Sequence, residues 1–275
     1  MSGSHQVAGD PVIALACEGL KMDKSRKMFL QFSGVAIVLV IWELSGRVLG
    51  ELLLAPPSIV AVSYIELLLD GEMLTELGAS MRQMFVGFGF SCLIGMPLGA
   101  AMGRSKIIDA LVHPWISMMV VTSVAALAPV FILLFGTGFE FRAAIVFVAS
   151  IGYVVLTAYH GSRGIDPKML DVARSFGTGR IDIYRKVVLP ALFPYLITGA
   201  RLGLVHAIRA MIVAEMFVIV GYGGLIFQTG QDLSTAPILS YLVTIMIVSI
   251  GANLLLSWVG RRVAPWYDSK MAAGQ

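Results

Sequence analysis

The sequence predicts an all-α membrane protein with six transmembrane helices. Three observations lead to this prediction: the composition, the long uncharged segments and the distribution of positive charge. Of the 275 residues, 57% are hydrophobic and 13% are charged, whereas a soluble domain is about 45–50% apolar and about 25% charged. The mean hydropathy of +0.85 agrees. The chain lacks the polar surface that a water-soluble fold of this length needs, which argues against a soluble enzyme.

Four segments contain no Asp, Glu, Lys or Arg and are long enough to cross a bilayer core, which takes about 20 apolar residues. They are 83–103, 110–139, 143–162 and 233–260. Two further apolar segments, one before residue 50 and one after residue 190, carry charged side chains. We therefore expect a transmembrane domain over 28–262, with spans at about 28–49, 79–103, 113–137, 141–162, 191–220 and 236–260.

The short loops predict the orientation, because loops rich in Lys and Arg stay in the cytoplasm. Basic residues precede the first span, follow the second, recur through 163–190 and follow the sixth, whereas the other loops carry mainly acidic residues. The N-terminal segment 1–27 and the tail 263–275 are therefore both expected in the cytoplasm. The net charge of +3 is too small to indicate a nucleic-acid partner.

The first span ends in an expected break. Glu43 and Arg47 lie four residues apart, so on a helix they can pair near the membrane edge. Pro56 and Pro57 should end the helix. Ser58 is then expected to cap a short amphipathic helix that reaches about residue 74 on the outer side. An ordered surface loop is the alternative.

Small residues recur every four positions in two of the spans. Gly95, Gly99 and Gly103 do so in the second span, and Gly199 and Gly203 in the fifth. This spacing lets helix backbones approach closely in lipid. We interpret these glycines as helix-packing positions without a chemical role.

The segment 163–190 has the pattern of two short helices. Asp166 and Pro167 are suited to the start of a helix, and Gly177 to a left-handed stop. Thr178 can cap a second helix, and Pro190 should end or redirect it before the fifth span. A compact amphipathic pair of this kind could dock a soluble partner. The alternative is an interfacial helix that binds anionic lipid heads.

Four ionisable residues interrupt the fifth span: Arg201, His206, Arg209 and Glu215. Charges at membrane depth cost roughly 2.5–3.5 kcal/mol each on insertion scales, so they face a cavity or a partner. In one interpretation Arg209, with His206 and Glu215, lines a translocation pathway that attracts an anion. In the other, the arginines pair with Glu43, Glu215 or backbone carbonyls of neighbouring helices. The glycine-rich segment 221–224 is expected to be a flexible turn.

The segment 163–190 also resembles a motif of the permease subunits of binding-protein-dependent ABC importers. That motif reads E-A-A, three residues, G, nine residues, I-x-L-P. Here 171–173 read Asp-Val-Ala, Gly177 follows after three residues, and 187–190 read Val-Val-Leu-Pro at the same spacing. Asp replaces Glu, and Val replaces the first Ala and the Ile. The stretches 173–177, 185–191 and 213–216 look like those of the nitrate, sulfonate and taurine permeases, and the resemblance covers about 54–262.

The resemblance implies a type I ABC importer permease with a cytoplasmic coupling-helix loop over 163–190. It implies a bacterial inner-membrane location and a small anionic solute, such as a sulfonate, nitrate or carboxylate, imported by alternating access. The implied partners are a second permease subunit (a homodimer), ABC ATPase subunits, an extracytoplasmic solute-binding protein and membrane lipid. The residues implied to couple to the ATPase are Asp171, Ala173, Arg174, Phe176, Gly177, Leu189 and Pro190.

The chain carries no G-x-x-x-x-G-K-[ST] phosphate loop. We therefore expect no cofactor in this chain, with ATP and Mg bound by a separate ATPase. No H-E-x-x-H, Cys/His cluster or G-x-S-x-G pattern occurs either, so no enzymatic activity is expected. Three alternatives stay open: an importer of an uncharged or cationic vitamin-like solute, a secondary transporter or channel without an ATPase, and a membrane-embedded enzyme.

Overall fold

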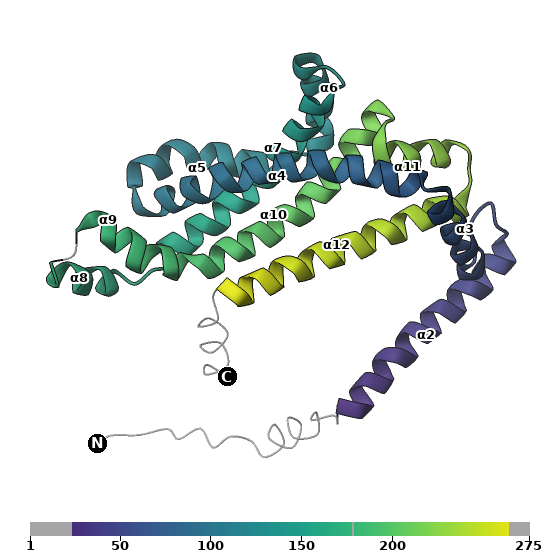
Figure 1. Cartoon of the computed structure of the whole chain (residues 1–275), viewed down its shortest axis with the longest axis horizontal. Coiled ribbons are helices and arrows are strands. Elements are labelled where there is room, and N and C mark those ends of the chain that lie inside the picture. Colours follow the sequence, from purple (N-terminus) through teal and green to yellow (C-terminus); the bar gives the residue numbers. More distant parts are fainter. Residues whose placement is uncertain (1–23, 178, 264–275) are drawn as a thin grey trace, which may run out of the picture.

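Three long helices pack side by side at the centre of the fold: α4 (Glu72–Arg104), α7 (Phe139–Arg163) and α10 (Leu189–Val218) (Figure 1). The computed structural model describes residues 24–177 and 179–263, which are almost entirely helical and contain no strand. The main apolar core lies where the three helices meet, and its largest members are Met84, Phe88, Phe141, Ile145, Leu204, Ile208 and Met211.

Glycines let α4 and α10 approach α7 closely. A Cβ on Gly99 of α4 would overlap a backbone oxygen of α7, and one on Gly103 would lie 2.5 Å from the Ser162 Cβ. A Cβ on Gly203 of α10 would lie 2.7 Å from Val154 Cγ2. Gly95 and Gly199 also face α7. Both glycine series noted in the sequence therefore lie against the same helix.

The order of these contacts gives the direction of the chain. Gly87, which lies eight residues before Gly95 in α4, faces Val146 of α7, whereas Gly103 faces Ser162. α4 and α7 therefore run parallel. The α10 glycines meet α7 in the reverse order, so α10 runs antiparallel to both.

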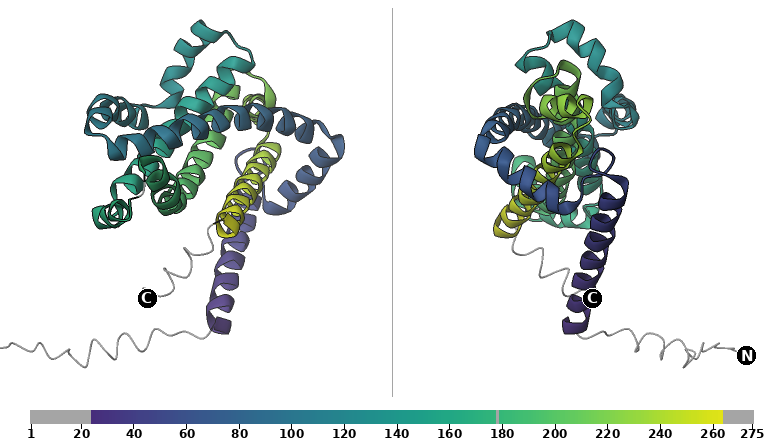
Figure 2. Two further views of the ribbon diagram at one scale, coloured as in Figure 1. Left: turned by 60° about the vertical axis from the view of Figure 1, so that its left-hand side comes forward. Right: turned by 90° about the vertical axis from the view of Figure 1, so that its right-hand side faces the viewer.

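An elbow joins α2 (Lys24–Leu49) to α3 (Pro57–Asp70), and α2 extends away from the central helices (Figures 1 and 2). The prolines do not end the first helix, because α2 already ends at Leu49, where Gly50 has a φ of +84°, and Ser58 does not cap α3. Pro56 takes the cap position and Pro57 the first helical position, because proline needs no backbone N–H there. α4 then begins directly after Gly71, which has a φ of +76°, and so starts earlier than the expected residue 79.

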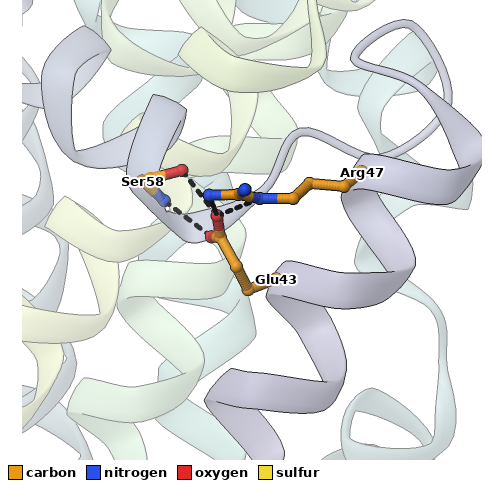
Figure 3. A network of polar contacts seen from close by, with 3 residues as sticks. All are labelled: Glu43, Arg47 and Ser58. Carbon is orange, nitrogen blue, oxygen red and sulfur yellow. Dashed lines mark hydrogen bonds and ion pairs between the residues drawn. The ribbon is translucent and has the colours of Figure 1, made fainter.

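Ser58 instead contacts a carboxylate of α2. Its hydroxyl donates to Glu43 Oε1 at 2.9 Å, and its backbone N–H donates to Glu43 Oε2 at 3.2 Å (Figure 3). The expected ion pair with Arg47 is present, with 2.7 Å between Arg47 Nη2 and Glu43 Oε1. One carboxylate therefore holds both sides of the elbow.

The third expected span, over 113–137, is not one continuous helix. It consists of α5 (Lys106–Val121) and α6 (Val124–Phe135), which are bent by 106° at Thr122 and Ser123. Both residues have extended backbone angles, and the Thr122 hydroxyl donates to the Met118 carbonyl at 2.7 Å. The described residues thus contain five helices long and apolar enough to span, or six if the bent pair counts as one.

The segment after α7 forms α8 (Pro167–Ser175), α9 (Arg180–Ile183) and the π-helix η1 (Tyr184–Val188), which runs straight into α10. Asp166 caps α8 as expected, accepting from the Lys168 N–H at 2.9 Å, and Gly177 has a φ of +73°. Thr178 lies outside the described residues. Pro190 does not end the helix, which is a correction: it lies in the first turn of α10, where a missing N–H is tolerated.

The glycine-rich segment 221–224 is also helical rather than a flexible turn. It forms the first turn of α11 (Gly221–Gln231), in which Tyr222, Gly223 and Gly224 are buried. The last helix, α12 (Thr235–Val263), runs along α10. Most of segments 1–27 and 263–275 lies outside the described residues.

Candidate functional site

The segment 163–190 projects from one end of the central helices as a small, self-packed unit (Figure 1). Its inner side chains form an apolar cluster around Ile165, Ile183 and Val188, and Leu170 and Ala173 pack against this cluster. Asp171 and Arg174 are paired on the α8 surface, with 3.0 Å between Oδ1 and Nη1. This small core gives the segment a defined shape.

One side of α8 exposes apolar side chains. Phe176 is 83% exposed, and Met169 and Val172 are also exposed. Leu189 is exposed at the start of α10, and Pro190 beside it is partly buried. Of the residues assigned to ATPase coupling, Ala173 faces the small core, whereas Asp171, Arg174, Phe176 and Leu189 are exposed.

The polar residues of α10 separate into two environments. His206 and Arg209 lie one turn apart, with Arg209 exposed and His206 half-buried. The ring of His206 stacks on Tyr153 of α7, with 3.6 Å between centroids and 10° between planes. Arg209 has no hydrogen bond or ion pair within 24–177 and 179–263. Tyr153 carries no recognisable signal in the sequence, because it is one aromatic residue in an apolar helix.

Arg201 lies on the exposed side too, but it has a partner. Its Nε donates to Asn253 Oδ1 of α12 at 2.8 Å. The structural interpretation expected an acidic residue or a backbone carbonyl as the partner, whereas the structure shows a side-chain amide. An arginine at membrane depth therefore joins α10 to α12.

Glu215 is separated from Arg209 and fully buried. Its carboxylate accepts from the side-chain amide of Gln83 in α4 and, at 2.8 Å, from the backbone N–H of Gly223 in α11. Of the three residues suggested for a pathway, the structure brings His206 and Arg209 together and places Glu215 in a closed polar network.

The comparison with known proteins agrees with this architecture. A model of the family described as the binding-protein-dependent transport system inner membrane component matches residues 93–268. A probable ABC transporter permease protein of Brucella abortus (strain 2308) is 29% identical over 222 residues, covering 80% of this chain and 88% of the relative. The taurine transport system permease protein TauC of Escherichia coli (strain K12) is 25% identical over 251 residues, covering 88% of this chain and 91% of the relative.

The putative aliphatic sulfonates transport permease protein SsuC of Bacillus subtilis (strain 168) is 26% identical over 258 residues, covering 92% and 94%. Among solved structures, an inward-facing conformation of the MetNI methionine ABC transporter superposes with a TM-score of 0.60 at 18% identity, over 72% of this chain and 96% of that one. The resemblance found in the sequence is thereby confirmed. The chain belongs to the family of binding-protein-dependent transport inner membrane components, and it is the multi-pass permease subunit of an ABC importer whose ATPase is a separate chain.

Proposed function

We propose that this permease imports a small organic anion of the sulfonate class. The observation that carries the proposal is the exposed Arg209 on α10, with no acceptor among the described residues and with His206 and Tyr153 beside it. Arg209 lies about 30 Å along the helix from Leu189, at 1.5 Å per residue. A guanidinium on a membrane-spanning helix faces a water-filled pathway, an anion or the membrane interface, because the lipid interior does not solvate it.

Arginine also matches the chemistry of the solute. Its planar group presents a fork of N–H donors that fits oxyanions with two or more oxygens. A sulfonate has three such oxygens, and relatives of this chain are named for taurine and aliphatic sulfonates. The flat Tyr153–His206 stack supplies an adjacent wall for the organic part of the solute.

The segment 163–190 is proposed as the docking site of the ATPase. Its rigid core and its uncovered Phe176 fit insertion into a groove of a soluble partner. Two permease subunits, here two copies of this chain, would share the pathway, and a solute-binding protein would deliver the anion at the α11 end. In this arrangement the segment 163–190 and both termini lie on the cytoplasmic side.

Uptake by proteoliposomes that contain the permease, its ATPase and its binding protein tests the solute class. Taurine and ethanesulfonate represent the anions, and riboflavin and thiamine represent uncharged and cationic solutes. Uptake of the sulfonates should fall about tenfold or more in Arg209→Gln, as expected for loss of a charge-assisted contact. Arg209→Lys should retain part of the sulfonate uptake, since lysine keeps the positive charge but not the paired N–H donors of the guanidinium.

Arg201→Gln is the matched control, because Arg201 lies on the same helix but bonds Asn253. It should leave the solute preference unchanged. Uptake of riboflavin or thiamine but of neither sulfonate would show that the anion assignment is wrong. Uptake that needs neither ATP nor the ATPase would favour a secondary transporter.

A further inference from the structure

The N-terminus of α11 is capped by residues from two other helices. Val220, its own cap residue, provides no side-chain hydrogen bond. Instead, Ser80 Oγ of α4 accepts from the Tyr222 N–H at 3.0 Å, and Glu215 Oε2 of α10 accepts from the Gly223 N–H at 2.8 Å. The positive end of the α11 dipole is thus held against a carboxylate.

The same carboxylate also joins α4 to α10. The Gln83 side-chain amide donates to Glu215 Oε1, so both oxygens of Glu215 receive a hydrogen bond. Ser80, Gln83 and Glu215 are each at most 1% exposed. We call these three residues, with the first turn of α11, the Glu215 latch. It contacts three helices and lies in the interior of the protein.

Two glycines make the latch possible. An added Cβ on Gly221 would lie 2.7 Å from Glu215 Cδ, and one on Gly223 would lie 2.7 Å from Glu215 Cβ. Gly221 also has a φ of +66°, which disfavours other residues. The sequence expectation of a flexible turn is thus replaced by a tightly fitted contact.

The latch lies at the opposite end of α10 from the segment 163–190 (Figure 1). α10 is continuous from Leu189 through Glu215, and at 1.5 Å per residue this length is about 39 Å. Because η1 runs into α10 without a break, a displacement of the segment 163–190, the proposed ATPase docking site, acts on one uninterrupted helix. At its far end, the buried carboxyl group of Glu215 accepts a hydrogen bond from the first turn of α11.

We propose that Glu215 is a positioning residue that makes α11 move with α10, so that motion at the docking segment reaches the opposite end of the permease. This proposal rests on the importer function given above. In it, α4, α10 and α11 keep their mutual arrangement through the transport cycle, because opening the latch would leave a carboxylate and helix N–H groups without partners in an apolar interior.

The test reverses the polarity of one hydrogen bond. In Glu215→Gln, the amide oxygen can still accept from Gly223, but the negative charge at the N-terminus of α11 is lost, and the new NH₂ finds an acceptor at Gln83 only if the Gln83 amide turns over. In the double variant Gln83→Glu with Glu215→Gln, the new carboxylate at 83 accepts from that NH₂, and the latch is complete again. The matched control is Glu140→Gln, at an exposed glutamate of α7.

Two readouts separate positioning from folding. The first is the distance between spin labels at Leu202 of α10 and Gln228 of α11, both exposed, measured with ADP and with ATP plus vanadate in variants that have Cys17 and Cys92 replaced by serine. The second is ethanesulfonate imported per ATP hydrolysed. We expect one unchanged distance in the parent protein, a state-dependent distance in Glu215→Gln, and the parent distance in the double variant.

The import-per-ATP ratio should fall about tenfold in Glu215→Gln, within the usual range for lost coupling between sites, and return in the double variant. Glu140→Gln should match the parent in both readouts. A Glu215→Gln variant with an unchanged distance and ratio would overturn the proposal, as would a loss that the double variant does not repair.

If Glu215→Gln does not assemble with the ATPase, Ser80→Ala serves instead, because it removes the acceptor for Tyr222 and leaves the Glu215–Gly223 hydrogen bond in place. It should lower the same ratio by a smaller factor, and an unchanged ratio would overturn the proposal. The distance readout needs no solute. A parent protein that imports no ethanesulfonate would therefore count against the proposed function and leave the test of the latch intact.

Discussion

Glu43 of α2 accepts hydrogen bonds from both the backbone N–H and the hydroxyl of Ser58 in α3 (Figure 3). The two residues are 15 positions apart and lie on opposite sides of the elbow between α2 and α3. α2 packs mainly against α3, and its apolar side chains are otherwise largely exposed. This carboxylate therefore supplies the side-chain hydrogen bonds that hold α2 against α3, next to the close packing of Gly46 on Pro56.

Glu43→Ala should lower the unfolding temperature in detergent and increase protease cleavage between α2 and α3. The physical reason is the loss of the acceptor that holds the start of α3. Arg47→Gln is the control, since it removes one donor but leaves the Ser58 contacts in place. Equal cleavage of Glu43→Ala and the unmodified protein would contradict a holding role for the carboxylate.

Gly99→Val should destabilise the packing of α4 on α7. A Cβ at this position already overlaps the α7 backbone, and overpacking typically costs about 1–3 kcal/mol. Gly89→Val is the control on the same helix, because a Cβ there meets no atom within 4 Å. The free energy of unfolding in mixed micelles is measured for Gly99→Val and for Gly89→Val. The interpretation fails if the two variants are equally stable.

Gly177→Val should weaken ATPase association through backbone strain alone. Gly177 has a φ of +73° and open space around the Cβ position, so the substitution creates no steric overlap with neighbours. A non-glycine residue in the left-handed region costs about 1–2 kcal/mol. Co-purification with the ATPase gives the measurement, with Gly179→Val as control because Gly179 has no positive φ. Similar ATPase recovery from both variants would argue against a role for the turn.

Phe176→Ala should reduce ATPase affinity without reducing the stability of the permease. The ring is 83% exposed, so its removal leaves no cavity. An aromatic anchor at an interface contributes about 2 kcal/mol or more, which corresponds to roughly a thirtyfold change in Kd. Phe85→Ala removes an exposed ring from α4 as a control. Titration of each permease variant with the purified ATPase measures the Kd. Equal Kd values for Phe176→Ala and the parent protein would exclude Phe176 as an anchor.

Tyr153→Leu should raise the KM for sulfonate import while assembly and stability stay near those of the parent. The substitution removes the surface on which His206 stacks, so the imidazole loses its fixed orientation beside Arg209. Tyr153→Phe keeps the ring and should retain the parent KM. If both variants lower the maximal rate and leave KM unchanged, the stack is not part of the solute site.

The sequence could predict those parts of the fold that depend on local chemistry. Apolar length identifies most of the long helices, prolines identify the start of α3, and the pair Asp166 and Gly177 identifies the limits of α8. Glycine spacing identified the packing face of α4, although Gly87 was missed. In each case the effect belongs to the residue type itself. Proline and glycine determine which backbone angles are available, and apolar side chains avoid water, in any chain.

Three features could not be predicted from the sequence. The bend at Thr122 and Ser123 lies inside an apolar stretch whose hydropathy is uniform, so composition contains no sign of it. The helix continues through Pro190, which lies in the first turn of α10 directly after a π-helical turn. Glu215 looked like a pathway residue because its partner Gln83 is 132 positions away in the sequence.

The parallel arrangement of α4 and α7 determines whether the chain crosses the membrane an odd or an even number of times between Glu72 and Val263. Two parallel helices in succession require the chain to return between them, so α5 and α6 must together carry it back despite their bend of 106°. The chain from Glu72 to Val263 then makes five traverses: α4, the bent pair, α7, α10 and α12. Reporters placed at Gly71 and directly after Val263 should therefore report opposite compartments.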